Sequence, residues 1–390
     1  MIKEKLKKTI LNKYNSELAK HEQEIVNSVL KDEDFNPVVN KRPDKVHRIA
    51  FFLGAILPFS GGVTSMLRLG TGLVQRGYDV TYVSFQNQDI SEMEQIAKKN
   101  LSGAQGTFQK ISTVPDDFDI VIATSWQSVY HAKRFKGYKM YFVQDYEPFF
   151  FKLNERYLLA EMTYKLGFHI VSLGEWNLAK IHQYCGDVKG ILDFITFPYE
   201  PGEYTMTARN YDIQKRTYKI AVYSKEEGKR LPNLLQVLLQ KTAQELKKRG
   251  IDIEILFFGF SPNIKTQIGK NLGKLTKTQL LNLYKTVDFG MCASMTNISL
   301  VPFEMIATGL PVIEFENGSF PFFFPADSAI LTDFNAHTLA EKLEDFIKHP
   351  QKIKDMMKIA HTHIRRLSWD NSIEEFDEIL MHIKEGVSYG

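Results

Sequence analysis

Short apolar runs alternate with helical stretches twice along this chain, and that alternation constrains the fold more than any other feature of the sequence. The runs are rich in β-branched residues, and such runs, when helices separate them, form parallel sheets that are covered on both faces. Between residues 197 and 202 a turn-rich stretch interrupts the series, which then starts again. We therefore expect an α/β protein with two Rossmann-like domains, at residues 46–200 and 201–390, preceded by an arm at residues 1–45.

The predicted strands create two sheet edges at which a ligand can bind. In the first domain we expect a helix at 61–75 and strands at 48–57, 78–84, 118–123, 139–143 and 169–172, the last of which closes the series. In the second domain we expect strands at 218–223, 252–258, 287–292, 310–314 and 329–331, helices that start at Pro232, Lys277, Pro302 and Asn335, and a helix at 370–384. Ligands bind beyond the carboxyl ends of such strands, so we expect a cleft that both rows of strand ends border.

The arm has the pattern of an amphipathic helix with a basic face. Apolar residues recur every four positions and lysines lie between them: Ile2, Leu6, Ile10, Tyr14 and Leu18, with Lys3, Lys5, Lys7, Lys8 and Lys13. A helix of this kind packs on the protein body or on a partner chain, or it contacts anionic lipid headgroups. The sequence leaves both interpretations open.

The composition argues against several classes of protein. A formal net charge of +3 gives no indication of nucleic-acid binding. The two cysteines, Cys185 and Cys292, provide neither a disulfide framework nor a metal cluster. The charged start of the chain is not followed by an apolar signal-peptide segment, and the longest apolar run, 49–59, is far shorter than the roughly 20 residues that span a bilayer. We expect a cytoplasmic protein, with peripheral contact to the inner face of the membrane through the arm as an open alternative.

Glu304 is the main candidate for ligand binding in the second domain. It opens a short apolar helix, Gly309 ends that helix, and a buried strand follows. A carboxylate at a helix start beside a strand's carboxyl edge can accept two hydrogen bonds from a ribose diol. We therefore expect Glu304 to bind ribose, and the alternative is a core helix with one solvated glutamate.

Glycines and basic residues follow the first strand of each domain. Gly61 and Gly62 let the backbone approach a ligand closely, and the helix that follows offers free N–H groups and a positive dipole end. In the second domain Arg230 can hold two phosphate oxygens, and Lys225 can act as a point charge. The alternative is a solvated basic turn, and Lys229 could take either role.

Residues 301–313 resemble the donor-site motif of family 4 glycosyltransferases, which are retaining enzymes with the GT-B fold, two Rossmann-like domains facing across a cleft. The resemblance implies that Lys225 and Arg230 clamp the donor diphosphate and that Gly61 and Gly62 form the glycine loop of the first domain. It also implies that the stretch from Thr276 to Tyr284 precedes the donor motif and borders the nucleobase.

The family pattern has two glutamates with seven residues between them, and this chain keeps only the second, Glu304. The first position is Thr296. In the family that first carboxylate touches the donor sugar, so the substitution leaves open whether the chain has an altered specificity or has lost catalysis. Side-chain and backbone groups that could still hold the donor are those of Thr296, Asn297, Ser299, Leu300 and Val301.

Residues 141–148 resemble a Val-Gln-Asp-Tyr-Glu-Pro segment of bacterial rhamnosyltransferases that build surface polysaccharides from dTDP-rhamnose. Asp145 and Glu147 lie at the end of a predicted strand and are candidates for contacts with the acceptor or the sugar. The alternative is a structural turn with a glutamate at the rim.

The resemblance implies a retaining, metal-independent glycosyltransferase that moves L-rhamnose from dTDP-rhamnose onto a growing cell-surface glycan, with the lipid-linked state of that acceptor left open. We find no Asp-x-Asp pair of the metal-dependent sugar-transferase type, and we expect no cofactor beyond the nucleotide sugar. Catalytic roles are assigned to Asp145, Glu147, Lys225 and Arg230. The alternatives are a non-catalytic glycosyltransferase-like subunit of a glycosylation complex and a sugar-nucleotide epimerase of the same fold, and the partner is a second copy or another glycosyltransferase.

Overall fold

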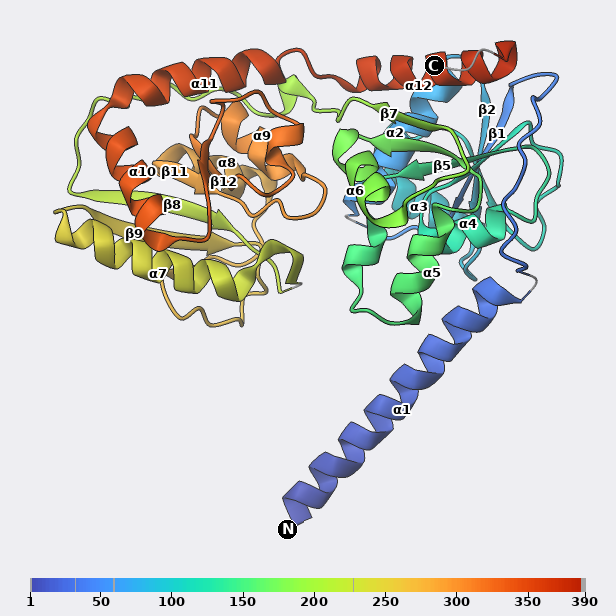
Figure 1. Ribbon diagram of the computed structural model, residues 1–390, viewed down its shortest axis with the longest axis horizontal. Coiled ribbons are helices and arrows are strands. Elements are labelled where there is room, and N and C mark those ends of the chain that lie inside the picture. Colours follow the sequence, from blue (N-terminus) through green and yellow to red (C-terminus); the bar gives the residue numbers. More distant parts are fainter. Residues whose placement is uncertain (1, 32, 59, 227, 387–390) are drawn as a thin grey trace. The chain divides into compact units, whose positions relative to one another are not determined.

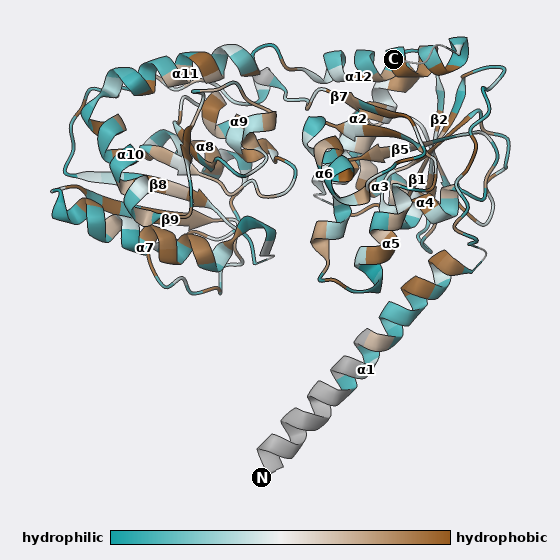
Figure 2. Cartoon of the chain, in the orientation of Figure 1, coloured by the Kyte–Doolittle hydropathy of each residue, from teal (hydrophilic) through white to brown (hydrophobic). Residues whose placement is uncertain are grey.

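The computed structural model describes residues 2–31, 33–58, 60–226 and 228–386, and the chain divides into two compact units (Figure 1). The first unit comprises Met1–Leu173, Leu178–Phe194 and Glu375–Gly390, and the second comprises Gly174–Asn177 and Ile195–Glu374. Each unit contains one sheet. In Figure 2 the strands of both sheets are mostly brown and the outward faces of the helices mostly teal, as expected when helices cover a buried sheet.

The described part of the first unit contains a seven-stranded sheet with the order β3-β2-β1-β4-β5-β6-β7. The central strand β1 pairs in parallel with β2 and β4, and its residues Ile49–Phe52 are fully buried because helices cover both faces. The strands are β1 (Arg48–Leu53), β2 (Asp79–Ser84), β3 (Thr107–Lys110), β4 (Ile120–Ala123), β5 (Tyr138–Val143), β6 (His169–Leu173) and β7 (Leu192–Ile195). Its helices include α2 (Gly61–Gln75), α3 (Ile90–Asn100), α4 (Trp126–Ala132), η1 (Glu147–Phe150), α5 (Glu155–Thr163) and, from Leu178 on, α6 (Glu175–Cys185).

The described part of the second unit contains a six-stranded sheet with the order β10-β9-β8-β11-β12-β13. Its strands are β8 (Thr217–Tyr223), β9 (Asp252–Phe258), β10 (Lys270–Asn271), β11 (Phe289–Met291), β12 (Val312–Phe315) and β13 (Ile330–Thr332). Its helices are η2 (Pro201–Glu203), η3 (Gly228–Arg230), α7 (Pro232–Lys248), α8 (Lys277–Thr286), α9 (Leu300–Ala307), η4 (Phe320–Phe322), α10 (Ala336–Lys348), α11 (Pro350–Ile364) and the start of α12 (Trp369–Glu385). The helix α7 packs on β9, whereas α9 packs on β11 and β12.

Several predicted elements differ from the structure. The run 169–172 does not close the first sheet, because β7 adds a strand beyond β6. The edge strand β3 and the two-residue strand β10 were missed because each is short and polar. The helix α9 begins at Leu300 rather than at Pro302. Glu304 therefore lies in the middle of that helix, and the expectation that it opens the helix is wrong.

The C-terminal segment packs with the first unit, which differs from the predicted assignment of residues 201–390 to the second domain. The ring of Phe376 in α12 lies 6.1 Å from that of Phe142 in β5. The Tyr78 hydroxyl donates a 2.5 Å hydrogen bond to Asp377, which also pairs with Arg76 at 3.6 Å. The sequence pattern shows that α12 has an apolar stripe, but it does not show which surface the stripe covers.

The arm forms the helix α1 (Ile2–Leu30), as predicted. Its predicted apolar positions Ile2, Leu6, Ile10, Tyr14 and Leu18 lie outside the residues whose side chains the structure describes, so the amphipathic face stays a prediction. At the other end of α1, Val29 is fully buried and the helix packs on α4. Within the described residues, no helix has the length and apolar content needed to cross a bilayer.

Candidate functional site

The carboxyl ends of β8 and β11 bring a set of polar residues together in the second unit. These two strands pair in parallel, with Val222 beside Met291, so the residues that follow each strand lie at the same edge of the sheet. Arg230 confirms this proximity, because its Nη1 donates a 3.2 Å hydrogen bond to the carbonyl oxygen of Ala293. The edge is the ligand-binding edge expected for an open α/β sheet.

Arg230 is a buried cation that makes few hydrogen bonds to the protein. It is 5% exposed, and the bond to Ala293 is its one hydrogen bond with the described residues. A guanidinium has five N–H donors, so most of those of Arg230 have no acceptor among the described residues. Its other neighbours are the buried Glu314, whose pKa its charge lowers, and the ring of Tyr223, whose centre lies 5.8 Å from Arg230 Cζ. The next residue, Leu231, adopts the left-handed conformation with φ 48° and ψ 47°, which is strained for leucine. The chain therefore holds a buried cation at this edge, next to a strained residue.

Lys225, the other predicted member of the clamp, is exposed and makes no ion pair with the described residues. Because Lys225 and Arg230 both follow β8, the structure places them on the same loop. Lys229 is half-buried on this loop and has a partner of its own. The two cations of the predicted clamp are thus near neighbours in the chain, one buried and one in solvent.

Three hydroxyl groups at this edge are buried and have no hydrogen-bond partner among the described residues. They are Ser224 Oγ after β8, Thr296 Oγ1 after β11 and Ser299 Oγ at the start of α9. Ser299 is the N-cap residue of α9, yet its side chain caps no backbone N–H. Thr296 and Asn297 are each 4% exposed, and Leu300, which follows Ser299, is 42% exposed. Buried polar groups normally have partners, so these three hydroxyls are candidates for hydrogen bonds to a ligand.

The carboxylate of Glu304 is surrounded by tyrosines. Tyr284 Oη donates to Glu304 Oε2 at 3.4 Å, and the hydroxyl of Tyr204 bonds to the same carboxylate. Burial raises the pKa of Glu304 to about 7, and these two hydrogen bonds oppose the rise because they favour the ionised form. A third hydroxyl, that of Tyr199, is buried without a partner and lies close enough to feel the charge of Glu304. The site therefore holds a half-buried acid that accepts hydrogen bonds from hydroxyl groups.

Glu314 is a buried acid that the sequence analysis did not select. Its side chain is fully buried at the carboxyl end of β12 and accepts hydrogen bonds from the backbone N–H and the hydroxyl of Ser294, at 3.1 and 2.6 Å. Burial raises the pKa of Glu314, and the positive charge of Arg230 acts against that rise. A glutamate that ends an otherwise apolar strand was the available sequence signal.

Thr276 and Tyr284 lie at the two ends of α8. Thr276 is an exposed N-cap residue whose side chain accepts from the backbone N–H of Gln279 at 3.4 Å, so its hydroxyl has a structural role. Tyr284 is fully buried and reaches Glu304. Lys277, beside Thr276, lies 5.2 Å from the centre of the Tyr204 ring. The start of α8 is therefore linked to the tyrosines that surround Glu304.

Gly61 and Gly62 lie at the exposed start of α2 in the first unit. Neither has a positive φ. A Cβ atom at Gly61 would meet nothing within 4 Å, and one at Gly62 would come no closer than 3.5 Å to Gln144. The amide of Gln144 donates to the carbonyl oxygen of Gly62 at 3.2 Å, which ties this turn to the end of β5. The fold itself thus gives no packing reason for glycine at either position.

Glu147 joins an internal hydrogen-bond network at the end of β5. Its carboxylate accepts from the backbone N–H of Trp126 and from the hydroxyl of Tyr141, both at 3.1 Å. Burial raises the pKa of Glu147 to about 7, against those hydrogen bonds. Asp145 accepts a hydrogen bond from the backbone N–H of Tyr146 at 3.0 Å. The structure thus places both predicted acids at the expected edge and gives each a role in holding the turn.

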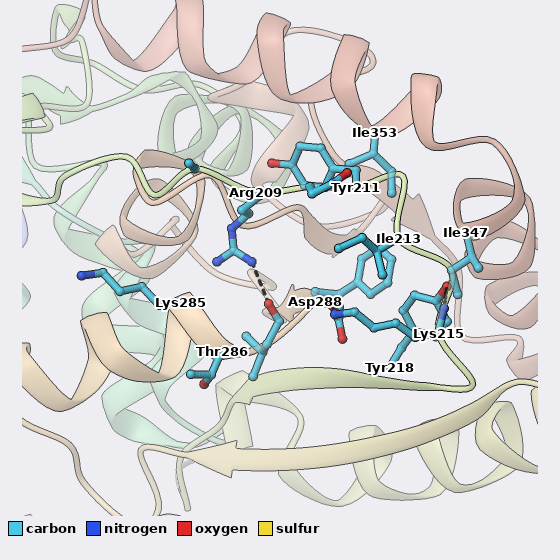
Figure 3. A pocket seen from close by; sticks show the side chains of 14 residues that line it. Arg209, Tyr211, Ile213, Lys215, Tyr218, Lys285, Thr286, Asp288, Ile347 and Ile353 are labelled. Carbon is cyan, nitrogen blue, oxygen red and sulfur yellow. Dashed lines mark hydrogen bonds and ion pairs between the residues drawn. The ribbon is translucent and has the colours of Figure 1, made fainter.

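A separate pocket of about 230 Å³ lies at the opposite edge of the second sheet (Figure 3). It is lined by the amino-terminal ends of β8 and β11, including Tyr218 and Phe289. Two basic residues around it already have partners within the protein: Arg209 donates to the carbonyl oxygen of Val287 at 2.7 Å, and Lys215 pairs with Asp288 at 2.5 Å. This pocket contains none of the predicted site residues. Among the described residues, no group of three or more His, Cys, Asp or Glu side chains could hold a metal ion.

Solved structures that resemble this chain share the GT-B fold. A sucrose-phosphate synthase from Thermosynechococcus elongatus aligns with a TM-score of 0.63 at 12% identity, covering 87% of this chain and all of that one. HepE from Anabaena, in complex with UDP-glucose, aligns with a TM-score of 0.63 at 12% identity over 86% of this chain and 99% of its own. WaaG, a glycosyltransferase involved in lipopolysaccharide biosynthesis, aligns with a TM-score of 0.55 at 14% identity over 85% of this chain and 99% of its own. These likenesses confirm the predicted fold.

A curated protein is similar to this chain in sequence. The chain is 25% identical over 356 residues to the O-antigen biosynthesis protein RfbC of Myxococcus xanthus, and the match covers 85% of this chain. The same match covers 26% of that relative, so the chain spans about a quarter of its length. No protein-family model matches the sequence.

Proposed function

We propose that this protein is a retaining, metal-independent glycosyltransferase that transfers a sugar from a nucleotide-sugar donor to an acceptor. The observation that carries the proposal is the Arg230 guanidinium, which is 5% exposed and makes one hydrogen bond to the described protein. A diphosphate supplies paired oxygens for the guanidinium N–H donors that the described protein leaves without a hydrogen bond. The fold supports the proposal, because a GT-B neighbour was solved in complex with UDP-glucose.

In this proposal the second unit holds the donor. Glu304 accepts hydrogen bonds from the ribose hydroxyls, since it already accepts hydrogen bonds from the hydroxyls of Tyr204 and Tyr284. Arg230, Lys225 and the backbone N–H groups at the start of α9 hold the diphosphate. The unpartnered hydroxyls of Thr296 and Ser299 then face the diphosphate and the donor sugar.

The difficult step is the departure of the diphosphate, because it carries negative charge away from the sugar. Arg230, Lys225 and the positive end of α9 stabilise that charge without a metal ion. The bond between the anomeric carbon and the phosphate oxygen breaks, and a bond to the acceptor oxygen forms on the same face. The acceptor's proton passes to the leaving phosphate oxygen. Asp145 and Glu147, at the edge of the first unit, are assigned to the acceptor, with Glu147 also holding the start of α4.

We propose L-rhamnose, carried by dTDP, as the donor sugar and a growing cell-surface glycan as the acceptor. The sugar rests on the resemblance of residues 141–148 and on Thr296 in place of a carboxylate. The acceptor class is supported by the 25% identical relative, whose name assigns it to O-antigen biosynthesis.

A thermal-shift screen with dTDP-rhamnose, UDP-glucose, UDP-N-acetylglucosamine and GDP-mannose tests the donor, because only ligands that bind the native state raise the melting temperature. We expect the largest shift with dTDP-rhamnose. A larger shift with another donor rules out dTDP-rhamnose as the preferred donor but leaves the proposed glycosyltransferase activity standing. Product analysis without an acceptor separates the other classes: an epimerised nucleotide sugar indicates an epimerase, and binding without turnover on any glycan indicates a non-catalytic subunit.

A further inference from the structure

The segment between η2 and β8 is bound to the carboxyl end of α9. Residues 204–211 form neither a helix nor a strand, and we call them the strap. The backbone N–H of Thr207 donates to the carbonyl oxygen of Thr308, the C-cap residue of α9, at 3.3 Å. The hydroxyl of Tyr211 donates to the carbonyl oxygen of the next residue, Gly309, at 2.6 Å. Two points of the strap are therefore fixed to the backbone where α9 ends.

Arg209, between these two points, binds the ends of two helices at once. Its guanidinium donates to the carbonyl oxygens of Tyr284 and, at 2.7 Å, Val287, which lie at the carboxyl end of α8 (Figure 3 shows the bond to Val287). Its Nε donates to the carbonyl oxygen of Thr308 at 3.5 Å. The last carbonyls of a helix have no partner within the helix, and a cation there interacts favourably with the helix dipole. One side chain thus joins the carboxyl ends of α8 and α9.

The two joined helices carry the two sides of one contact in the proposed donor site. Tyr284, whose carbonyl oxygen accepts from Arg209, donates its hydroxyl to Glu304. In α9 the backbone N–H of Thr308 donates to the carbonyl oxygen of Glu304 at 3.2 Å. Arg209 therefore holds the backbone on both sides of the bond between Tyr284 and Glu304. That bond is 3.4 Å long, so a small shift of either helix would break it.

The strap also carries the second hydroxyl that reaches Glu304. Tyr204 begins the strap, is 7% exposed and bonds to the Glu304 carboxylate. A Cβ atom at Gly309 would lie 3.2 Å from the carbonyl oxygen of Thr207, so the strap lies directly against the end of α9. Gly309 has a φ of 78°, which glycine adopts without strain. A strap anchored at Thr207 and Arg209 limits where Tyr204 can lie.

We propose that Arg209 is a positioning residue of the donor site, which sets the spacing of α8 and α9 so that two tyrosine hydroxyls converge on Glu304. Arg209 lines the pocket at the amino-terminal ends of β8 and β11, so it acts through Glu304 rather than on a donor at their carboxyl ends. The consequence for ribose binding rests on the proposed function. The contact between Tyr284 and Glu304 needs no ligand, and it can be tested separately.

A double-mutant cycle on stability tests the positioning without a ligand. Urea unfolding of Tyr284→Phe, Glu304→Met and the double variant at pH 8 gives the coupling between the two residues. We expect a favourable coupling in the wild-type background and its loss in the Arg209→Met background. The matched control is Arg249→Met, because Arg249 is also half-buried in the second unit but pairs with Glu344 at 2.6 Å. Stability should fall in the control, and the coupling should stay.

Calorimetry with UDP and inorganic pyrophosphate on the same samples tests the consequence for binding. UDP has a ribose diol and pyrophosphate has none. Arg209→Met should therefore bind UDP about tenfold more weakly and pyrophosphate like the wild type, because the hydrogen bonds lost are those of the ribose. Arg249→Met should bind both like the wild type.

Each other outcome has a defined meaning. No coupling in the wild type, an unchanged coupling or UDP affinity in Arg209→Met, or a loss that Arg249→Met shares overturns the proposal. If Arg209→Met does not fold, Arg209→Lys keeps the cation without the planar fork, and an undiminished coupling in that variant overturns it. If neither UDP nor pyrophosphate binds the wild type while the coupling is lost in Arg209→Met, the proposed function fails and the positioning stands.

Discussion

Tyr284 Oη lies 3.4 Å from Oε2 of Glu304, and this contact joins the end of α8 to the middle of α9. Tyr204 donates to the same carboxylate, so two hydroxyl groups already converge on it. Ribose hydroxyls have the same hydrogen-bonding chemistry, and in our proposal they bind at this carboxylate. The pKa of the Glu304 carboxyl should therefore change when a nucleotide sugar binds, and binding measurements can detect that change.

Binding of a nucleotide sugar should release a proton. Burial raises the pKa of Glu304 to about 7 in the free protein. Ribose hydroxyls that donate to the carboxylate favour its ionised form and lower that pKa. Affinity should then rise about tenfold from pH 6 to pH 8, and calorimetry in buffers of different ionisation enthalpy should detect the proton. The Glu304→Gln variant should bind more weakly and release none; a pH-independent affinity in the wild type rules out this role.

The raised pKa of Glu304 also predicts how the stability of the folded protein depends on pH. The folded-state pKa of Glu304, about 7, lies above the ordinary value of 4.5 for a glutamate. The folded protein therefore holds the proton more tightly than the unfolded chain, and the stabilisation is fully present below pH 4.5 and lost as pH rises through 7. We expect the free energy of unfolding of wild type, relative to Glu304→Gln, to fall between pH 5 and pH 8 in urea titrations. A constant difference would show that Glu304 is ionised throughout.

Replacing Gly61 and Gly62 with alanine should separate fold from function. Neither glycine is required by its φ angle or by packing, and alanine favours a helix over glycine by up to about 1 kcal/mol. The double variant should therefore unfold at the same or a higher temperature while its turnover falls, because the new methyl groups face the ligand. Gly103→Ala, at another open position, is the control and should leave turnover unchanged. Full turnover in the double variant removes these glycines from the site.

Thr296→Val should stabilise the protein or leave its stability unchanged, and it should lower turnover. The Thr296 hydroxyl is buried and has no partner in the part of the chain that the structure describes, so removing it breaks no hydrogen bond there and relieves a penalty on the order of 1 kcal/mol. The donor sugar would lose that hydrogen bond. Thr242→Val is the opposite control: its hydroxyl donates to Leu238 at 2.9 Å, so stability should fall and turnover should not. If Thr296→Val keeps full turnover, Thr296 does not contact the donor.

The repeated strand-and-helix pattern predicts the central strands well, because residues such as Ile49–Phe52 are buried on both faces and leave a continuous apolar run. It misses β3, which is polar and lies at the sheet edge. The site was predicted in part. Lys225, Arg230, Thr296 and Glu304 lie in the same unit, and Arg230 contacts the segment that follows β11.

Other features of the site depend on tertiary contacts that no local pattern shows. Tyr204 is far from Glu304 in the sequence. It lies in the segment that follows β7 and comes close to Glu304 only in the folded protein. Glu314 was passed over although its place in an otherwise apolar strand was an available signal, because its hydrogen bonds to Ser294 and its proximity to Arg230 do not show in the sequence. The unpartnered state of Thr296 and the burial of Arg230 follow from how neighbouring strands meet.

Calorimetric titration with dTDP and UDP in the presence of EDTA tests the central claim, that the second unit binds a nucleoside diphosphate through Arg230 and Lys225 without a metal. We predict saturable binding to the wild type. The affinity should fall at least about tenfold in Arg230→Met, because this variant loses a buried guanidinium. The affinity should fall less, and in a salt-dependent way, in Lys225→Met, because this variant loses an exposed charge. The Lys285→Met variant, at the pocket on the opposite sheet edge, should bind like the wild type. The account is contradicted if neither nucleotide binds, if binding requires Mg²⁺ or Mn²⁺, or if Arg230→Met binds as tightly as the wild type.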